Sequence, residues 1–217
     1  RCAILETVVE LYMKRLLCVL LLACSLPATH AASGDDRVLA AKDAVQRGDR
    51  IKLAKQLEAV RGHELEPYVE YWLLRLRLEE ADSAELRDFL ARQSGSYLAD
   101  KLRGEWLKTL GKHRQWDTFD AEYPPLVQTD QEITCYALQN RLRLADLGAL
   151  DEARPLWFVP AELPESCIPL MEQLIADKRL GADDIWERMR RLLEAKKFGA
   201  AKITAAYLPS NQAPSAK

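Results

Sequence analysis

The sequence predicts an all-α protein built from irregular, tetratricopeptide-like α-hairpins. Apolar residues recur at helical spacing, and breaks between the helical stretches lie roughly 33 residues apart, which is the period of helical solenoids. No segment of useful length alternates polar and apolar residues with the β-branched enrichment that is typical of strands. A repeat of that length accommodates two helices, so the 217 residues indicate about five hairpins.

The N-terminal part predicts export. Residues 1–12 contain no methionine and are interpreted as an upstream extension or the edge of a fragment. Met13-Lys14-Arg15 is positively charged, an apolar run follows from Leu16 to Ala23, and small and polar residues continue to Ala31. We interpret residues 13–31 as a signal peptide cleaved after Ala31. The apolar run is shorter than the roughly 20 residues that span a bilayer.

A lipoprotein signal is the alternative interpretation of the leader. Residues 21–24 read Leu-Leu-Ala-Cys and loosely resemble a lipobox, in which Cys24 would be lipidated. The bulky Leu22 fits that pattern poorly, so the cleaved signal peptide is favoured.

Removal of the leader would leave two cysteines, Cys135 and Cys167, 32 positions apart. Two cysteines in an exported protein usually pair, so the sequence predicts a disulfide between them. Closing a loop of this length corresponds to about 3–4 kcal/mol of chain entropy. Two buried free thiols are the alternative. A zinc site is not expected, because no histidine or further cysteine stands at ligand spacing.

Three stretches carry the clearest helical patterns. The first follows Pro67, a residue suited to the first turn of a helix, and its apolar positions are Tyr68, Tyr71, Trp72, Leu76 and Leu78. The second repeats at strict i+4 spacing in Leu98, Leu102, Trp106 and Leu110. The third has the stripe Ile185, Met189, Leu192 and Leu193. Acidic residues 183–184 begin the third stretch and lysines 196–197 lie near its end, as the helix macrodipole favours.

Glycines mark the expected breaks between helices. They are Gly48, Gly111, Gly148 and Gly181, and Asp82-Ser83 adds a further break as an N-cap. Residues 145–153 look like the turn of a tetratricopeptide hairpin, in which small Ala145 and Ala153 would let two helices approach closely. Residues 110–116 are a looser version of the same turn. The last hairpin, Gly181 to Leu208, is expected to leave an uncovered face with some of Ile185, Met189, Leu192, Phe198 and Ile203.

Composition and motifs exclude several classes of function. The 31 basic and 33 acidic residues give a net charge of -2, which argues against a nucleic-acid binder held by a general positive field. The sequence contains no glycine-rich phosphate loop, no His-Glu-x-x-His motif and no Cys-x-x-Cys motif. We therefore assign no catalytic, cofactor-binding or metal-ligating residue, and we expect no cofactor.

Three groups of residues could carry chemistry but have simpler interpretations. His63 and His113 lie at predicted helix ends and are expected to be solvated, with no identifiable nucleophile or carboxylate partner. Glu79, Glu80 and Asp82 resemble a general-acid cluster, although charge runs at a helix end are usually solvated. Aromatic residues that could stack on sugar rings are expected mainly to fill the core; they are Tyr68, Tyr71, Trp72, Trp106, Trp116, Trp157 and Trp186.

An ordered series of residues runs from Pro67 to Cys167. Its members are Pro67-Tyr68-Val69-Glu70-Tyr71, Phe89-Leu90, the Leu98–Leu110 stretch with Trp106-Leu107, Trp116, Phe119, Tyr123, Cys135-Tyr136-Ala137, Ala145, Gly148, Ala153, Leu156-Trp157 and Pro164-Glu165-Ser166-Cys167. In order and spacing this series resembles the start of a soluble lytic murein transglycosylase. The resemblance covers nearly all of the mature chain but only the front portion of a family member.

The resemblance implies a fold and a function. In that family a signal peptide precedes a long array of α-hairpins that curls into a ring in the periplasm, and a lysozyme-like catalytic domain follows at the far C-terminus. Residues 32–217 would accordingly form a right-handed superhelical scaffold domain that is incomplete at its C-terminus. Peptidoglycan glycan strands would be the partner of the full-length enzyme, with cell-wall proteins as further partners, and no nucleic acid or membrane span is expected.

The catalytic glutamate of the family stands in a motif that is not found in this chain. The enzymes cleave the β-1,4 bond between N-acetylmuramic acid and N-acetylglucosamine: a glutamic acid protonates the leaving oxygen and the muramyl 6-hydroxyl closes a 1,6-anhydro ring. That glutamate stands in a Glu-Ser-x-Phe motif. Here Glu165-Ser166 is followed by Cys167-Ile168, so the role is not transferred to Glu165.

Two interpretations remain. In the first, the chain is a truncated lytic transglycosylase that holds the scaffold without its catalytic domain. In the second, it is a complete, non-enzymatic periplasmic helical-repeat adaptor that binds a protein partner in its groove. The first is favoured, because Ser210 to Lys217 contains no clear helix that would cap an exposed solenoid end.

Overall fold

The computed structural model describes residues 33–209. The expected extension at residues 1–12, the expected signal peptide at residues 13–31 and the alternative lipidation of Cys24 all lie outside the described residues, as do residues 210–217.

Over residues 33–209 the chain forms eleven α-helices and two short 3-10 helices, with no strand. The α-helices are α2 (Gly34–Gln46), α3 (Arg50–Ala59), α4 (Glu66–Leu76), α5 (Ser83–Arg92), α6 (Tyr97–Lys112), α7 (Trp116–Glu122), α8 (Gln131–Arg143), α9 (Gly148–Ala153), α10 (Ile168–Ala176), α11 (Ala182–Glu194) and α12 (Phe198–Ala205). The 3-10 helices are η1 (Arg154–Phe158) and η2 (Glu165–Cys167). The all-α class is therefore confirmed.

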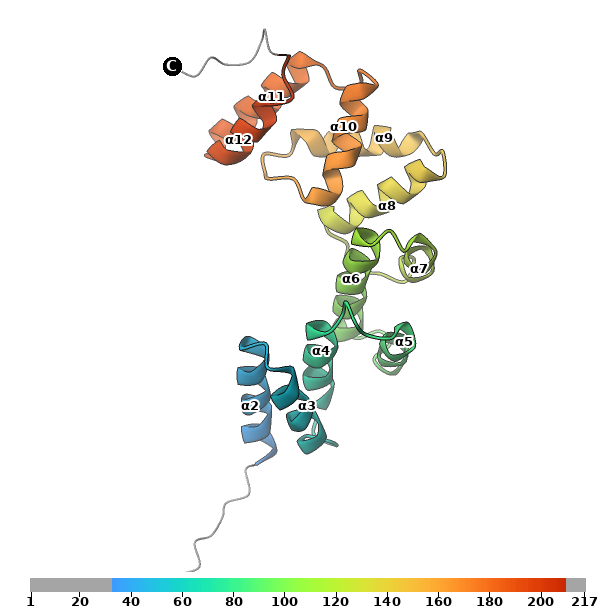
Figure 1. The fold of residues 1–217 in the computed structure, drawn as a ribbon, viewed down its shortest axis with the longest axis vertical. Coiled ribbons are helices and arrows are strands. Elements are labelled where there is room, and N and C mark those ends of the chain that lie inside the picture. The colour runs from blue at the N-terminus through green and yellow to red at the C-terminus, as the bar shows by residue number, and fades with distance from the viewer. Residues whose placement is uncertain (1–32, 210–217) are drawn as a thin grey trace, which may run out of the picture.

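The helices form hairpins that stack into an elongated superhelical array (Figure 1). Helices α2, α4, α6, α8 and α10 begin at residues 34, 66, 97, 131 and 168, so the repeats start 31 to 37 residues apart. This spacing confirms the repeat that the sequence predicted. The last repeat departs from the pattern, because α10 is followed by a separate hairpin of α11 and α12 that lies beside it at one end of the array (Figure 1).

Side-chain caps explain where many of these helices begin. The side chains of Ser33, Asp49, Asp82, Ser96 and Asp130 each accept a hydrogen bond from a backbone N–H in the first turn of the helix that follows. Pro67 occupies the first turn of α4, as predicted. Helix α11 begins with the expected acidic residues but ends at Glu194, so lysines 196–197 lie just beyond it.

The predicted glycine breaks are only partly correct. Gly48 does form a turn with a φ of 68°, but Gly111 lies inside α6. Gly148 starts α9, and Gly181 is the N-cap of α11. The left-handed turn positions after α6, α8, α10 and α11 are taken by non-glycine residues; they are Arg114, Ala145, Lys178 and Lys196. Ala145 therefore shapes a turn, and its expected role in close helix packing is wrong.

Gly111 has a packing reason for being glycine. A Cβ atom at this position would lie 2.3 Å from Cγ of the Tyr136 ring, so the tyrosine of α8 packs directly on the α6 backbone. The glycine at position 111 therefore marks a close approach between two helices and not a break between them.

The core consists of three apolar clusters in series along the array. The first joins α2, α3 and α4 around Leu53 and Val69. The second extends from α4 to α8 and includes Phe89, Leu102 and Leu107. The third extends from α8 to the C-terminal hairpin and is lined by Cys135, Cys167, Trp157, Leu170, Leu174, Ile185 and Met189. Each hairpin is thus stabilised mainly by its neighbours.

The expected uncovered face of the C-terminal hairpin is only partly present. Ile185, Met189 and Leu192 are buried in the array, where α11 contacts α12 and η1. Phe198 and Ile203 are 65% and 62% exposed.

Candidate functional site

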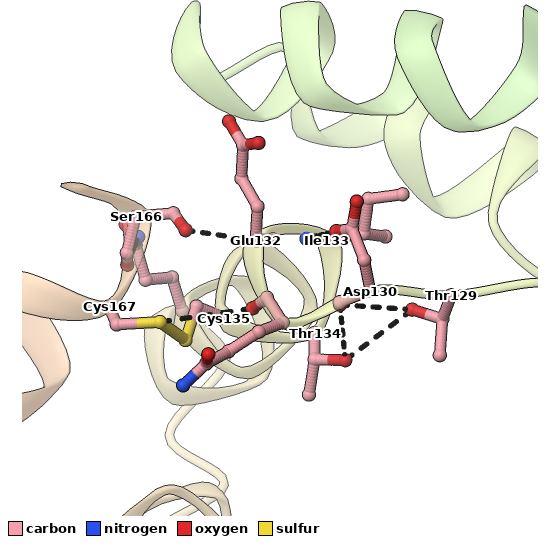
Figure 2. The surroundings of a disulfide bond; sticks show 10 residues. Thr129, Asp130, Glu132, Ile133, Thr134, Cys135, Ser166 and Cys167 are labelled. Carbon is pink, nitrogen blue, oxygen red and sulfur yellow. Dashed lines mark hydrogen bonds between the residues drawn. A yellow bond between two sulfur atoms is a disulfide. The ribbon is translucent and has the colours of Figure 1, made fainter. Parts of the chain in front are cut away.

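A disulfide forms the junction between α8 and the segment that leads into α10 (Figure 2). Cys135 lies in the second turn of α8 and Cys167 ends η2. Their Cα atoms are 5.0 Å apart and both residues are fully buried. The bond that the sequence predicted is therefore present in the structure.

The start of α8 is fixed by charges on both sides. Asp130 caps the helix by accepting a hydrogen bond from the backbone N–H of Ile133 at 3.0 Å (Figure 2). Lys108 of α6 places its Nζ atom 2.5 Å from Asp130 and 3.0 Å from Glu132. Burial alone would raise the pKa of Asp130, but the hydrogen bonds from Lys108 and the backbone lower it overall. Likewise, burial opposes the charge of Lys108, but the two carboxylates raise its pKa.

Glu165 and Ser166, beside the disulfide, lie in different environments: Ser166 is buried and Glu165 is exposed. Ser166 is buried, donates from Oγ to the carbonyl oxygen of Glu132 at 3.0 Å (Figure 2), and accepts a hydrogen bond at its own carbonyl from Nε2 of Gln139 at 2.5 Å. Its hydroxyl therefore joins η2 to α8. Glu165 is exposed and faces a pocket.

That pocket has a volume of about 250 Å³ and lies between η2, α10 and the C-terminal hairpin. Trp157 and Met171 are almost fully buried at its base. Ile168 and Ile203 are exposed at its edge, from α10 and α12 respectively. A mostly apolar concave surface with a few polar groups is the usual form of a binding site.

Buried Arg188 of α11 holds the wall of the pocket in place. Its guanidinium donates hydrogen bonds to the backbone carbonyls of Trp157, Val159 at 3.1 Å and Ala161 at 2.9 Å. It also lies over the Trp157 ring, with Cζ 5.1 Å from the ring centroid. Burial lowers the pKa of Arg188. The three carbonyl groups accept hydrogen bonds from the buried guanidinium. These bonds hold the end of η1 and the loop after it against α11.

The two predicted solvated histidines both have carboxylate partners, which corrects the sequence-based expectation. Nε2 of His63 lies 3.1 Å from Oδ1 of Asp35, and Nε2 of His113 lies 2.5 Å from Oε2 of Glu79. The first pair joins the start of α2 to the loop before α4, and the second joins the α4–α5 loop to the end of α6. The sequence could not reveal them, because the partners are 28 and 34 residues away along the chain.

The acidic run after α4 is not a catalytic cluster. Glu79 pairs with His113, whose hydrogen bond is the main cause of the lowered pKa of Glu79. Glu80 pairs with Arg50 at 2.9 Å, and Asp82 caps α5. The three carboxylates thus have three separate structural roles.

The aromatic residues are mainly core residues, as the sequence predicted. Tyr71, Trp106 and Trp157 are buried, and Trp72 and Trp116 are partly buried. Tyr68 and Trp186 are exposed, but they lie on α4 and α11, far apart in the array (Figure 1). They do not form one sugar-stacking surface.

Residues 33–209 contain neither a candidate metal site nor a candidate membrane span. Within that part of the chain, histidine, cysteine and acidic side chains form no group of three that could hold a metal ion. The helices there also include none with the length and apolar character needed to cross a bilayer.

Comparison with solved structures identifies proteins with the same fold. The 70-kDa soluble lytic transglycosylase of Escherichia coli superposes with a TM-score of 0.63 at 18% identity, covering 82% of this chain and 29% of the enzyme. A complex of a 70-kDa soluble lytic transglycosylase with bulgecin A gives the same values. An inactive mutant of lytic transglycosylase Slt from Pseudomonas aeruginosa gives a TM-score of 0.62 at 26% identity, covering 80% of this chain and 28% of the enzyme.

The chain therefore resembles the soluble lytic transglycosylases in structure and spans less than a third of their length. No protein-family model matches it, and no curated protein does.

The pocket and Arg188 are the features that sequence reasoning missed. The pocket is built from residues of two 3-10 helices, three α-helices, the loop before η2 and the turn after α12, so no local sequence pattern predicts it. Arg188 lies three residues after Ile185 on α11, beside the apolar stripe. This position on the buried face was the local sequence feature that could have indicated a buried arginine.

Proposed function

We propose that this chain is the helical scaffold part of a periplasmic lytic transglycosylase that acts on peptidoglycan. Such an enzyme cleaves the β-1,4 bond between N-acetylmuramic acid and N-acetylglucosamine and releases 1,6-anhydromuropeptides. The observation that carries the proposal is the similarity of the hairpin array to two lytic transglycosylases over 80–82% of this chain. The sequence series from Pro67 to Cys167 supports it independently.

The disulfide supports the proposed location. A buried bond between Cys135 and Cys167 is suited to an oxidising compartment such as the periplasm. The expected signal peptide at residues 13–31 would deliver the chain there.

The proposed role is structural and not catalytic for the described residues. A general acid in this chemistry must be held where it can reach the glycosidic oxygen. Glu165 is exposed beside a serine that is committed to the α8 backbone, so we do not propose it as that acid.

Grafting tests the proposal. Residues 33–209 replace the matched segment of the Pseudomonas aeruginosa enzyme, and release of anhydromuropeptides from sacculi is measured. We expect the chimera to keep activity, as should a control graft of the matched Escherichia coli segment. A folded chimera that is inactive, while the control graft is active, would contradict the proposal.

The adaptor interpretation remains the second candidate, favoured by the open pocket at the C-terminal hairpin. The coding sequence beyond Lys217 separates the two: a reading frame with a Glu-Ser-x-Phe motif supports the enzyme, and a stop codon supports the adaptor.

A further inference from the structure

We propose that this chain self-associates through its C-terminal hairpin, with the α11–α12 turn of one copy seated in the α10–α12 pocket of another. The turn consists of Lys196, Lys197 and Phe198, and the pocket is the one edged by Glu162 and Glu165. The two surfaces carry opposite charges, and each also presents apolar side chains.

The turn presents one exposed apolar side chain next to two exposed lysines. Phe198 is 65% exposed although it is the first residue of α12. Lys196 and Lys197 are exposed, and within residues 33–209 neither makes an ion pair or a side-chain hydrogen bond. Covering this phenyl ring with another surface would remove apolar area from water, which favours association.

The pocket presents the opposite arrangement. Its base is apolar, with Trp157 and Met171 each 1% exposed, and its edge carries exposed Ile203. Glu162 and Glu165 are exposed at the same edge, and over the described residues their side chains form no ion pair or hydrogen bond. Elsewhere in the array carboxylates commonly pair with arginines, as Glu152 does with Arg141.

Arg188 lines the same pocket but forms no ion pair with these two carboxylates. Its guanidinium is directed to the three backbone carbonyls of the loop after η1, and it makes no ion pair in residues 33–209. The carboxylates of Glu162 and Glu165 at the edge therefore stay available to a cationic partner.

A second copy fits better than an unrelated ligand because the complementary segment belongs to this chain. The phenyl ring of Phe198 would enter the apolar pocket, and the two lysines would reach the two glutamates. Because every copy carries both surfaces, two copies can exchange their turns symmetrically in a closed dimer. Opposite charges at the edge would also steer the encounter, so association should weaken as salt rises.

Charge exchange tests this assignment. Sedimentation equilibrium of the purified chain should show a monomer–dimer equilibrium. The pocket variant Glu162→Lys/Glu165→Lys and the turn variant Lys196→Glu/Lys197→Glu should each raise the dimer dissociation constant by about tenfold or more, because like charges then meet. Mixing the two variants should restore association as a heterodimer, and a chain with all four substitutions should again form a homodimer.

Two controls keep the result specific. Lys178→Glu changes another exposed left-handed turn residue and should leave association unchanged. Phe198→Ser should abolish association while the circular dichroism spectrum stays helical. A chain that is monomeric at all concentrations would overturn the proposal. Association that none of the charge variants weakens would overturn it too, since the contact would then lie on another surface.

Discussion

At the scale of single residues, the disulfide between Cys135 and Cys167 is part of the third core cluster. Cys135 and Cys167 are fully buried, and Ser166 adds a hydrogen bond from the same segment to α8. The bond therefore closes a loop that already has a defined native geometry. Its main effect is to restrict the unfolded chain, as loop-closure entropy requires.

Replacing both cysteines by alanine should lower the free energy of unfolding by about 3–4 kcal/mol. Chemical denaturation of the double variant and of the parent, with and without reductant, measures this difference. The reduced parent should lose a similar amount. Thiol titration of natively exported protein should find neither Cys135 nor Cys167 free, and two titratable thiols would contradict the bond.

The buried charge of Arg188 shows why residue-level function was hard to predict. An arginine on an amphipathic helix normally extends to solvent. Here the segment from Trp157 to Ala161 directs three carbonyl groups toward it. Those carbonyl groups lie where η1 ends, so no backbone N–H of a continuing helix pairs with them and they need another donor. Only the folded chain brings α11 beside them.

At the scale of helices, α6 and α8 are joined by a polar contact and by an unusually close apolar one. Lys108 connects the two helices through Asp130, and Gly111 connects them through the Tyr136 ring. These two contacts make separate predictions.

The contact between Lys108 and Asp130 should make stability depend on pH. The pKa of Asp130 is lowered, so its stabilisation is present above the pKa of the unfolded chain and is lost as pH falls through the folded value. The pKa of Lys108 is raised, so its contribution is present below the unfolded pKa and is lost as pH rises through the folded value. The pair therefore stabilises the fold between these two limits.

Lys108→Met should raise the pKa of Asp130, because burial then acts without the lysine. Carboxyl titration by NMR measures that shift. The loss of stability at pH 7 should be no more than about 1 kcal/mol, since both side chains are partly exposed, and it should shrink below the pKa of Asp130. Lys42→Met, at an exposed lysine of α2, is the matched control. An unchanged Asp130 titration would contradict the prediction.

Gly111→Ala should destabilise the chain by about 1–3 kcal/mol, because the new Cβ would lie 2.3 Å from the Tyr136 ring. The matched control is Gly104→Ala in the same helix, where the Cβ would meet Ile133 at 3.5 Å, an ordinary contact. That control should stabilise the chain by up to about 1 kcal/mol through helix propensity. Thermal unfolding compares the two variants, and equal effects would show that packing at Gly111 is loose.

The sequence predicted the all-α class and three clear helical stretches, because periodicity and N-caps are local signals. Asp82 caps α5 and Pro67 lies in the first turn of α4, as those signals indicate. The turns were harder to predict. Ala145 and Lys178 adopt left-handed conformations that their residue types do not favour, and packing of the flanking helices imposes them. The pocket combines residues of separate repeats, so it could be identified only in the folded chain.

At the scale of the whole molecule, the three core clusters are joined by shared helices. Helix α4 contributes Val69 to the first cluster and Leu74 to the second. Helix α8 contributes Ile133 to the second and Leu138 to the third. Stability is therefore transmitted from neighbour to neighbour, as in a one-dimensional array. Within residues 33–209 the shared helices contact helices that come before and after them, whereas α2 contacts only later helices and α12 packs mainly on α11.

This arrangement predicts a gradient of local stability that hydrogen exchange can measure. Helix α6 buries eight residues, including Leu102, Trp106 and Leu107, whereas α12 buries only Ala201 and Thr204. Amides of α6 should exchange most slowly, because opening this helix disrupts contacts with α4, α5, α7 and α8. Amides of α12 should exchange much faster, and those of α11 should be intermediate because Ile185 and Leu192 are buried. Measurements at a concentration where the chain is monomeric exclude protection by a second copy. Equal protection of α6 and α12 under those conditions would mean that the array opens as one cooperative unit, and the series coupling of the three clusters would be wrong.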